Sequence, residues 1–507
     1  MKCLPLVALP ALLAVLPLKA VEQKPNIVYI LADDLGYGDV HCLNPQRGRI
    51  ATPHLDQFAK DGKTFTDAHS GASVCTPTRY GLLTGRYAWR TRLQAGVLDG
   101  SDDPPLIAAD RLTVATFLKQ QGYSTAAIGK WHLGFASEPP ASTNFPDRDA
   151  AKLLKKQGGK KASPGGLGLP VGSRIIEGPI TRGFDYFWGC SNARTMSGLI
   201  ENDRVIENIQ PMEMLPKLSQ RAVDYVLQQA DSAKLGKPFF LYLPLTSPHA
   251  PIVPSREWQG KSGLGDYGDF VMQTDAVVGD VMAALEKSAL ADNTLVIFTS
   301  DNGCSPAADV TGLEKQGHFP SAGFRGYKAD IWDGGHRVPF LVRWPGKVRA
   351  ATQSAQVICH TDFMATCADL LDLPLPGSIP DSVSFLPALL DQDEKPLREA
   401  IVHHSIHGMF SIRQENWKLE LCPGSGGWGK PGDGDAQALS LPPVQLYDMK
   451  SDPAETNNVQ ADHPDIVAKL TALLEKYVND GRSTPGSQQA NDAPINLFKT
   501  TNRKAKK

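Results

Sequence analysis

The chain lacks several features that would assign it to a specialised class of proteins. Neither sign of charge dominates its 507 residues, because 52 Lys and Arg stand against 54 Asp and Glu for a net charge of −2. Charge alone therefore gives no reason to expect nucleic acid as a partner. Internal repeats are absent, and the eight cysteines do not have the spacing of zinc ligands. With 41% hydrophobic and 21% charged residues, the composition is that of a globular protein with a large core.

Long apolar runs are also missing after the N-terminus. There, Lys2 precedes an apolar run, Leu4–Leu18, which is short and broken by three prolines, with small residues near Ala20. This pattern predicts a signal peptide over residues 1–20; a membrane anchor is the alternative, which the shortness of the run disfavours. We expect a soluble mature protein without a stable membrane anchor, exported to the periplasm or the extracellular space.

Four short apolar runs end in polar residues. Their continuous hydrophobicity is typical of strands covered on both faces, as in a parallel sheet. The runs are residues 26–32, 124–129, 239–243 and 294–299, followed by Asp33 and Asp34, by Lys130 and His132, by His249, and by Asp301 and Asn302. Ligands of such folds bind beyond the carboxyl ends of the strands, so we expect these polar side chains to form one site.

Helical patterns alternate with these strands and indicate an α/β fold with a central, mostly parallel sheet. The predicted helices cover residues 111–121, 217–229, 270–285 and 362–371. The main domain is predicted over residues 21–395. Within it, residues 137–172 are rich in Lys, Gly and Pro and indicate a long surface insertion, which is either a solvated loop or a segment that recruits anions.

A smaller C-terminal α+β subdomain is predicted over residues 396–480. Short alternating runs at 401–405, 409–413 and 417–421 indicate a small antiparallel sheet, and residues 463–479 indicate a helix packed against it. Residues 481–507 are polar and predict a disordered tail.

Oxygen-bearing side chains dominate two of the strand ends. Asp33, Asp34, Asp301 and Asn302 offer three carboxylates and one amide oxygen, a ligand set that suits Ca²⁺ or Mg²⁺ rather than zinc. An Asp-Asp pair alone is more often a turn or a helix cap. The second pair of oxygen ligands favours a metal site.

The most specific motif is Cys75-Thr-Pro-Thr-Arg79, which is followed by Tyr-Gly-Leu-Leu-Thr-Gly-Arg86. This stretch resembles the signature of the type I sulfatases, in which the cysteine is oxidised to Cα-formylglycine. Lys130-Trp-His132, the Ser-Pro-His249-Ala-Pro segment and Lys328 in Gly-Tyr-Lys-Ala-Asp match further motifs of that family. One departure is Thr78, where the family most often has Ser or Ala.

The resemblance covers nearly the whole mature chain and is strongest to arylsulfatase A-like and N-acetylgalactosamine-6-sulfatase-like members. It implies an alkaline-phosphatase-like core, residues 21–395 being the catalytic domain, with a smaller C-terminal domain. It implies one Ca²⁺ per chain, with Mg²⁺ as the alternative, held by Asp33, Asp34, the modified Cys75, Asp301 and Asn302. The catalytic residues that it implies are Cys75, Arg79, Lys130, His132, His249 and Lys328.

These residue types suit the hydrolysis of an anionic sulfate ester. Under the resemblance, a hydroxyl of the hydrated Cys75 aldehyde attacks sulfur, and Asp301 takes its proton. Lys130, Lys328, Arg79 and the cation stabilise the sulfate oxygens. His249 protonates the departing alcohol, and His132 helps the second hydroxyl to expel sulfate, so one hard displacement becomes two easier steps.

Further expectations concern partners and the remaining cysteines. We expect a sulfated carbohydrate as substrate, and a formylglycine-generating or anaerobic sulfatase-maturating enzyme as the partner that modifies Cys75. Without Cys3 in the signal peptide and Cys75, six cysteines remain, which either form up to three disulfides or stay as buried thiols. Candidate substrate contacts are Asn192, Arg194, His318 and His336, for each of which a structural role is favoured.

Two other functions remain as alternatives. A phosphonate or phosphate ester hydrolase of the same superfamily could use the same nucleophile, and a non-catalytic pseudosulfatase could bind glycans. Two-zinc phosphatases would need Ser or Thr as nucleophile and more His and Asp ligands, so Cys75 and the Lys130 and Lys328 pair disfavour them.

Overall fold

A mixed twelve-stranded sheet forms the centre of the computed structural model, which describes residues 23–99, 103–138, 169–196 and 198–499. The predicted signal peptide and most of the predicted 137–172 insertion lie outside the described residues. In spatial order the strands are β13 (Thr352–Ser354), β2 (Lys63–Phe65), β12 (Phe340–Arg343), β11 (Thr294–Ser300), β1 (Asn26–Asp33), β10 (Phe239–Pro248), β4 (Ser124–Lys130), β7 (Tyr186–Cys190), β8 (Gly198–Glu201), β9 (Arg204–Asn208), β6 (Arg174–Glu177) and β5 (Ala136–Glu138).

The middle of this sheet is parallel, as the continuous apolar runs predict. β1 pairs in parallel with β10 on one side and with β11 on the other, and β10 pairs in parallel with β4. All eight residues of β1 are buried, because helices cover both faces of the sheet. The carboxyl ends of these four strands therefore lie at one edge.

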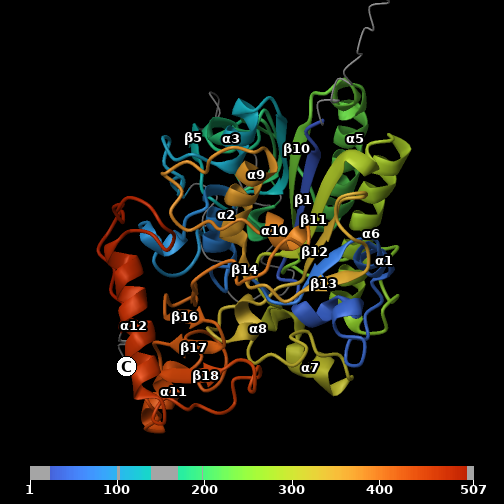
Figure 1. Ribbon diagram of the computed structural model, residues 1–507. Helices are drawn as coiled ribbons and strands as arrows, with labels where there is room; N and C mark the ends of the chain where they lie inside the picture. The colour runs from blue at the N-terminus through green and yellow to red at the C-terminus, as the bar shows by residue number, and fades with distance from the viewer. Residues whose placement is uncertain (1–22, 100–102, 139–168, 197, 500–507) are drawn as a thin grey trace, which may run out of the picture.

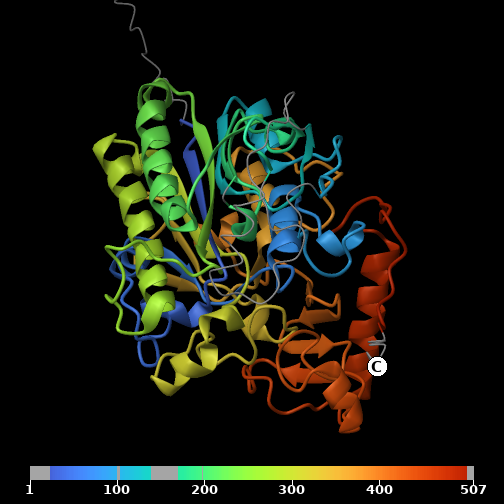
Figure 2. The ribbon, with the colours of Figure 1, turned by 180° about the vertical axis from the view of Figure 1, so that it is seen from behind.

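Helices pack on both faces of the sheet and explain its two hydrophobic cores (Figures 1 and 2). One core joins the sheet to α1 (Pro53–Asp61), α5 (Pro211–Lys234) and α6 (Gly265–Lys287). The other core joins it to α2 (Cys75–Thr84), α3 (Val114–Gln120), α9 (Phe363–Leu370) and α10 (Leu386–Leu389). The helices predicted at 111–121, 217–229, 270–285 and 362–371 are present as α3, α5, α6 and α9, and the predicted α/β fold class is confirmed.

The C-terminal part forms a separate four-stranded antiparallel sheet. Its strands are β15 (Ile401–His404), β16 (Phe410–Gln414), β17 (Trp417–Glu420) and β18 (Gln445–Asp448). The first three match the predicted runs, whereas β18 lies beyond a loop with the short helix α11 (Asp433–Ala438). Helix α12 (Pro464–Asn479) packs on this sheet through Leu470, Leu474 and Tyr477.

Residues 481–499 differ from the predicted disordered tail. Asn491 accepts a hydrogen bond from the buried Arg90 guanidinium at 3.0 Å, and Asp492 pairs with Arg86 at 2.9 Å. Composition misses this order because the partners lie some 400 residues earlier in the chain. Residues 500–507 of the predicted tail lie outside the described residues.

Three short connecting elements matter for the sites below. They are the paired strands β3 (Ala68–His69) and β14 (Ile358–Cys359) and the one-turn helix α8 (Asp333–His336). The short helix α7 spans Val310–Lys315. Together the three elements place residues from distant parts of the chain beneath the start of α2.

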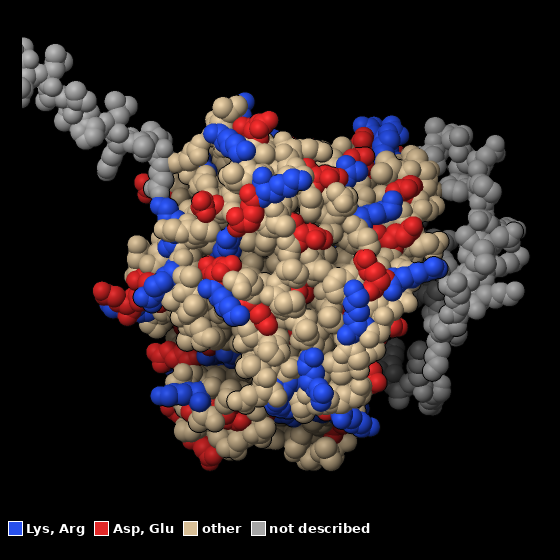
Figure 3. All heavy atoms as spheres, turned by 90° about the vertical axis from the view of Figure 1, so that its right-hand side faces the viewer, with Lys and Arg blue, Asp and Glu red and all other residues tan. Residues whose placement is uncertain are grey.

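The state of the cysteines and the distribution of charge on the surface are those of an ordinary globular protein. In the described part of the chain the cysteines are free thiols, so none of them forms a disulfide there. On the face shown in Figure 3, acidic and basic side chains are interspersed. Over the described ranges no helix is long and apolar enough to cross a bilayer.

Candidate active site

Cys75 is the first residue of α2 and is 1% exposed. Backbone N–H groups at the start of a helix are free to bind an anion, and the helix dipole favours negative charge there. Pro77 is tolerated because residues in the first helical turn have no intrahelical acceptor. Thr78, where the sulfatase signature usually has Ser or Ala, donates its hydroxyl hydrogen to the carbonyl oxygens of Ala72 or Val74, at 3.0 and 3.1 Å. The extra methyl group of Thr78 is buried within the fold.

Two parallel neighbours, β1 and β11, bring the oxygen ligands together, as expected for strand ends at one edge. Asp33 is the last residue of β1, and Asp301 and Asn302 directly follow β11. The Asp34 N–H donates to Asp301 Oδ1 at 3.1 Å, and the Asn302 amide donates to Asp34 Oδ1 at 2.8 Å. Asp34 has a left-handed backbone, with φ of 65°, which a non-glycine residue rarely adopts outside turns and functional sites.

Three basic side chains neutralise these buried carboxylates. Lys130 Nζ lies 2.7 Å from Asp33 Oδ2, and Lys328 Nζ lies 2.6 and 2.8 Å from the two Asp34 oxygens. Arg79 donates two hydrogen bonds to Asp301 Oδ2, at 3.1 and 2.7 Å. Charges buried this deeply are tolerated only when they are paired in this way.

The pKa values of the carboxyl groups diverge. Burial alone would raise the pKa of Asp33, but Lys130 and the neighbouring bases hold it well below its usual range. Burial, reinforced by the charge of Asp33, raises the pKa of Asp301 to about 6. A nearby cation would favour the ionised form of Asp301.

A hard cation fits this group of residues. The side-chain oxygen of Asn302 is buried and has no hydrogen-bond partner, an unusual state for an amide oxygen. The amide group of Asn302 lies beside Asp34, which its nitrogen contacts at 2.8 Å, and carboxylate and amide oxygens are the ligand chemistry of Ca²⁺ or Mg²⁺. Ligand atoms of Asp33, Asp34, Cys75 and His249 also lie within 4.8 Å of one another.

The Cys75 thiol is a poor nucleophile in this setting. Its Sγ lies 3.6 Å from Asp33 Oδ1 and 3.4 Å from Lys328 Nζ. Burial and the charge of Asp301 raise the pKa of the thiol to about 12, although Lys130 and Lys328 act in the opposite direction. The thiol is therefore protonated at neutral pH, whereas the reactive species of a cysteine is the thiolate.

Two histidines also belong to this site, and each has one ring nitrogen that makes no hydrogen bond to a backbone carbonyl. His249 Nδ1 lies 2.5 Å from the Ala250 carbonyl oxygen, which can only accept, so Nε2 is the nitrogen left to face Asp34 at 3.6 Å. His132 Nε2 similarly donates to the Leu98 carbonyl at 2.7 Å, and its Nδ1 has no partner. Burial lowers the pKa of His249 to about 4 and that of His132 well below its usual value.

A cavity of about 240 Å³ opens above these groups. Its inner wall contains the side chains predicted from the strand ends and motifs, namely Cys75, Lys130, His132, His249 and Lys328. Arg79 and the carboxylates lie behind them. The structure thus brings together every residue of the predicted catalytic and metal sets.

The outer wall contains residues that the sequence patterns do not single out. They are Gly96–Asp99, Ile406 and Trp428, beside the candidates Asn192 and Arg194. Of the other two candidate substrate contacts, His318 is buried against Asp39 at 2.8 Å and His336 belongs to a separate histidine group, and neither lines this cavity. Trp428 comes from the C-terminal subdomain. Its exposure is the only feature that identifies it as a candidate binding residue, and the sequence does not show that exposure.

The arrangement of these groups agrees with a match in sequence. The family model described as Sulfatase matches residues 25–373. The chain belongs to the sulfatase family. It is 34% identical over 496 residues to an N-acetylgalactosamine-6-O-sulfatase of Bacteroides thetaiotaomicron, across 90% of this chain and 93% of that protein. It is 33% identical to human arylsulfatase A, across 93% and 91% of the two chains.

Structural similarity gives the same assignment. A protein solved in work on glycosaminoglycan metabolism by Bacteroides thetaiotaomicron superposes with a TM-score of 0.74 at 30% identity, across 90% of this sulfatase and 99% of that chain. The solved structures that it resembles include sulfatases of the alkaline phosphatase superfamily. This sulfatase is therefore a sulfuric ester hydrolase, as the sequence motifs predict.

Proposed function

We propose that this sulfatase removes sulfate from carbohydrate monoesters, with a formylglycine made from Cys75 as its nucleophile and one Ca²⁺ beside it. The observation that carries the proposal is the position of Cys75. It begins α2 at the inner end of the cavity, between the carboxylates of Asp33 and Asp34 and the ammonium group of Lys328.

The state of the thiol supports the modification. A thiol whose pKa is raised to about 12 cannot supply a thiolate at neutral pH, whereas a hydrated aldehyde at the same position supplies an oxygen nucleophile. The modification requires a partner, a formylglycine-generating or an anaerobic sulfatase-maturating enzyme. It also agrees with export through the predicted signal peptide, which we propose for this chain.

The metal site would consist of Asp33, Asp34, Asp301, Asn302 and an oxygen of the modified residue 75. The orphaned Asn302 oxygen and the three carboxylates support this assignment. A bound Ca²⁺ would act as a Lewis acid that withdraws charge from the sulfate oxygens.

The basic residues would bind and orient the sulfate group. Lys130 and Lys328 are fixed by Asp33 and Asp34, so their ammonium groups are already in place before the substrate enters. Such preorganised charge in a buried site is often the largest contribution to catalysis. Arg79 would hold both the hydroxyl of residue 75 and the Asp301 carboxylate, to which it is already bonded.

Three groups would move protons. Asp301, with its pKa raised to about 6, would take the proton of the attacking hydroxyl. His249 would donate a proton from Nε2 to the leaving alcohol, and the negative charge of the bound sulfate would favour its protonated form. His132, whose Nδ1 has no partner, would accept the proton of the second hydroxyl.

The outer wall of the cavity supports a sugar as the alcohol part. The Trp428 side chain is 41% exposed and offers an aromatic face on which the C–H face of a pyranose can pack. Asn192 and Arg194 add polar groups on the same wall. The relatedness to an N-acetylgalactosamine-6-O-sulfatase favours a sulfated hexosamine or galactose.

Release of inorganic sulfate from defined 4-O- and 6-O-sulfated N-acetylgalactosamine and galactose tests the proposal. We expect turnover of at least one of these sugars and none of the matching sugar phosphates or phenyl phosphonate. Faster turnover of a phosphonate or phosphate would favour the other hydrolase of the superfamily. Glycan binding without sulfate release by the modified protein would make the chain a pseudosulfatase.

The sugar part of the proposal has its own test. Trp428→Ala should raise KM for the sulfated sugar about tenfold, the loss of one aromatic contact worth roughly 1.4 kcal/mol, with little change in kcat. Trp258→Ala removes a tryptophan that lines a different surface cavity and should change neither constant. Equal effects of the two changes would contradict a role for Trp428 in substrate binding.

A further inference from the structure

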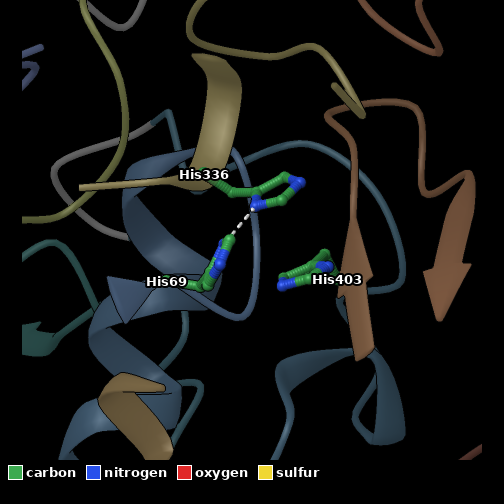
Figure 4. A group of neighbouring side chains, drawn as sticks. All are labelled: His69, His336 and His403. Carbon is green, nitrogen blue, oxygen red and sulfur yellow. Dashed lines mark hydrogen bonds between the residues drawn. The ribbon is translucent and has the colours of Figure 1, made fainter. Parts of the chain in front are cut away.

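Three buried histidines form a second group, separate from the cavity. His69 ends β3, His336 ends α8 and His403 belongs to β15, and each is at most 1% exposed. One nitrogen of each ring lies within 4.8 Å of the others, and Figure 4 shows the rings facing a common space. None of the three lines the active-site cavity.

The hydrogen bonds around His69 and His336 fix where their hydrogens are. His69 Nε2 lies 2.7 Å from Asp67, whose pKa is lowered because Arg337 and its other basic neighbours outweigh the effect of burial. The carboxylate accepts, so Nε2 carries the hydrogen and Nδ1 of a neutral ring is a lone pair. His336 Nε2 lies 2.9 Å from the Ile331 carbonyl oxygen, so its Nδ1 is likewise a lone pair.

These two lone pairs face each other. His69 Nδ1 and His336 Nδ1 are 3.0 Å apart, the contact drawn as a dashed line in Figure 4. Two acceptors at that distance repel unless a cation lies between them. Lys418 Nζ lies 3.2 Å from His336 Nε2 and could donate to it in the other tautomer of His336. Lys418 already donates to the Ile331 oxygen at 3.1 Å, however, and an Nε2 without a hydrogen would face that oxygen at 2.9 Å as a second acceptor.

His403 adds a third nitrogen to the same space. Its Nδ1 is bonded to the Ser411 hydroxyl at 3.1 Å, whereas its Nε2 is buried without any partner. A single proton shared by His69 and His336 would leave this nitrogen unsatisfied. A metal ion could be coordinated by all three nitrogens.

We propose that His69, His336 and His403 form a zinc site. Imidazole nitrogens suit Zn²⁺ and not the hard cation of the active site. The outer hydrogen bonds to Asp67, Ile331 and Ser411 are those that orient metal-binding histidines. The pKa values of all three rings are lowered, chiefly by burial, which disfavours a proton as the cation.

Binding requires a limited rearrangement. Tetrahedral Zn–N bonds of about 2.0–2.1 Å place two ligand nitrogens roughly 3.3 Å apart, close to the present His69–His336 contact. His336 and His403 are stacked, with ring centroids 3.8 Å apart and planes at 12°, so His403 must tilt to bring its nitrogen to the metal. Its ring is held through the Ser411 hydroxyl, which can rotate with it.

The site would join three segments around the start of α2. The Ser70 N–H donates to the His336 carbonyl at 2.8 Å, and the Ser73 N–H donates to the His404 carbonyl at 3.0 Å. The segment from His69 to Cys75 therefore runs between α8 and β15. A metal on the three histidines would fix this segment to the C-terminal sheet and act on stability.

Zinc titration of the chelator-treated full chain, reloaded with Ca²⁺, tests the site. The wild-type protein should bind one more Zn²⁺ per chain than His403→Phe, and zinc at 100-fold above Kd should raise Tm by roughly 2–3 °C. Co²⁺ in place of zinc should give the visible absorption of a tetrahedral site in the wild type only. His404→Phe removes a buried histidine of the same strand outside the group and should behave as the wild type.

Equal zinc stoichiometry and equal Co²⁺ spectra in the wild type and His403→Phe would overturn the proposal. If Tm of the wild type responds to pH but not to zinc, the cation between His69 and His336 is a proton, and this result would also overturn the proposal. His403→Gln provides a second variant if His403→Phe does not fold. Ca²⁺ and Mg²⁺ in place of Zn²⁺ should leave Tm of the Ca²⁺-loaded protein unchanged.

Discussion

The side chains around Cys75 divide into those that face the cavity and those that hold them in place. Lys328 and Lys130 face the cavity, and each is fixed by one carboxylate of the proposed metal set. The same aspartates would therefore bind the cation and position the lysines. Loss of one oxygen ligand should disturb both functions.

The two roles of these aspartates predict the effect of removing the metal ion. Treatment with a calcium chelator should lower kcat/KM at least about 100-fold, since the sulfate oxygens lose their Lewis acid, and Ca²⁺ should restore it better than Mg²⁺, which demands stricter octahedral geometry. Asn302→Ala, which deletes the orphaned oxygen, should raise the Ca²⁺ concentration needed for half-maximal activity. Activity that survives complete chelation would contradict a catalytic cation.

The raised pKa of Cys75 gives a pH prediction for the unmodified protein. The thiol is protonated below about pH 12, so raising the pH from 6 to 9 produces almost no thiolate. Protein expressed without a maturating enzyme should therefore stay inactive throughout this range, measured as sulfate release. Activity that rises with pH in protein shown to contain unmodified Cys75 would mean that the thiolate is a nucleophile.

At the scale of elements, the Gly-Leu-Leu-Thr-Gly-Arg tail of the motif has a structural explanation. Gly85 ends α2 in a left-handed conformation, with φ of 60°, and its N–H bonds to the Gly81 carbonyl. A Cβ at this position would lie 2.5 Å from Ile379 Cγ2. The motif thus specifies where the helix carrying Cys75 ends, as well as the nucleophile.

Gly85→Ala should reduce the free energy of unfolding by about 1–3 kcal/mol more than Gly122→Ala. Both glycines have positive φ, but a Cβ on Gly122 meets nothing within 4 Å, so it reports the backbone strain alone. Urea unfolding measures the difference. Equal losses would show that the contact with Ile379 relaxes without cost.

The strand ends were the part of the site that sequence could predict, and the reason is geometric. β1, β4, β10 and β11 are parallel, and apolar runs locate the carboxyl ends of β1, β4 and β11 to within one residue, whereas β10 continues five residues beyond its run. Asp33, Lys130, His249 and Asp301 therefore converge at one edge. Trp428 and His403 escaped prediction because loop 424–432 and β15 reach the catalytic domain only through tertiary packing.

At the scale of the whole molecule, the C-terminal segments complete the catalytic domain. The Trp428 and Gly429 N–H groups donate to Asp330 Oδ1 at 2.9 and 2.7 Å, two residues from Lys328. Farther along, residues 481–499 cover Arg86 and Arg90, both buried. The end of the chain therefore stabilises the loops and helix that carry the site.

Removal of these last contacts should destabilise the whole protein. Asn491→Ala combined with Asp492→Ala removes the carboxylate that pairs with Arg86 and one acceptor of Arg90, which keeps its pair with Asp381, and should cost about 1–3 kcal/mol, seen as a lower Tm. Asp462→Ala changes an exposed aspartate in the same region and serves as the control. Equal Tm values for all three proteins would mean that residues 491 and 492 contribute nothing to stability.

The mass of the tryptic peptide from Thr64 to Arg79, recorded on the same active preparation that releases sulfate, tests the central claim most directly. We predict that residue 75 carries an aldehyde in place of its CH₂SH group, and that Cys75→Ser, purified in parallel, keeps the fold but loses at least about 10⁴-fold in kcat. An unmodified cysteine in a preparation with full activity would contradict the account.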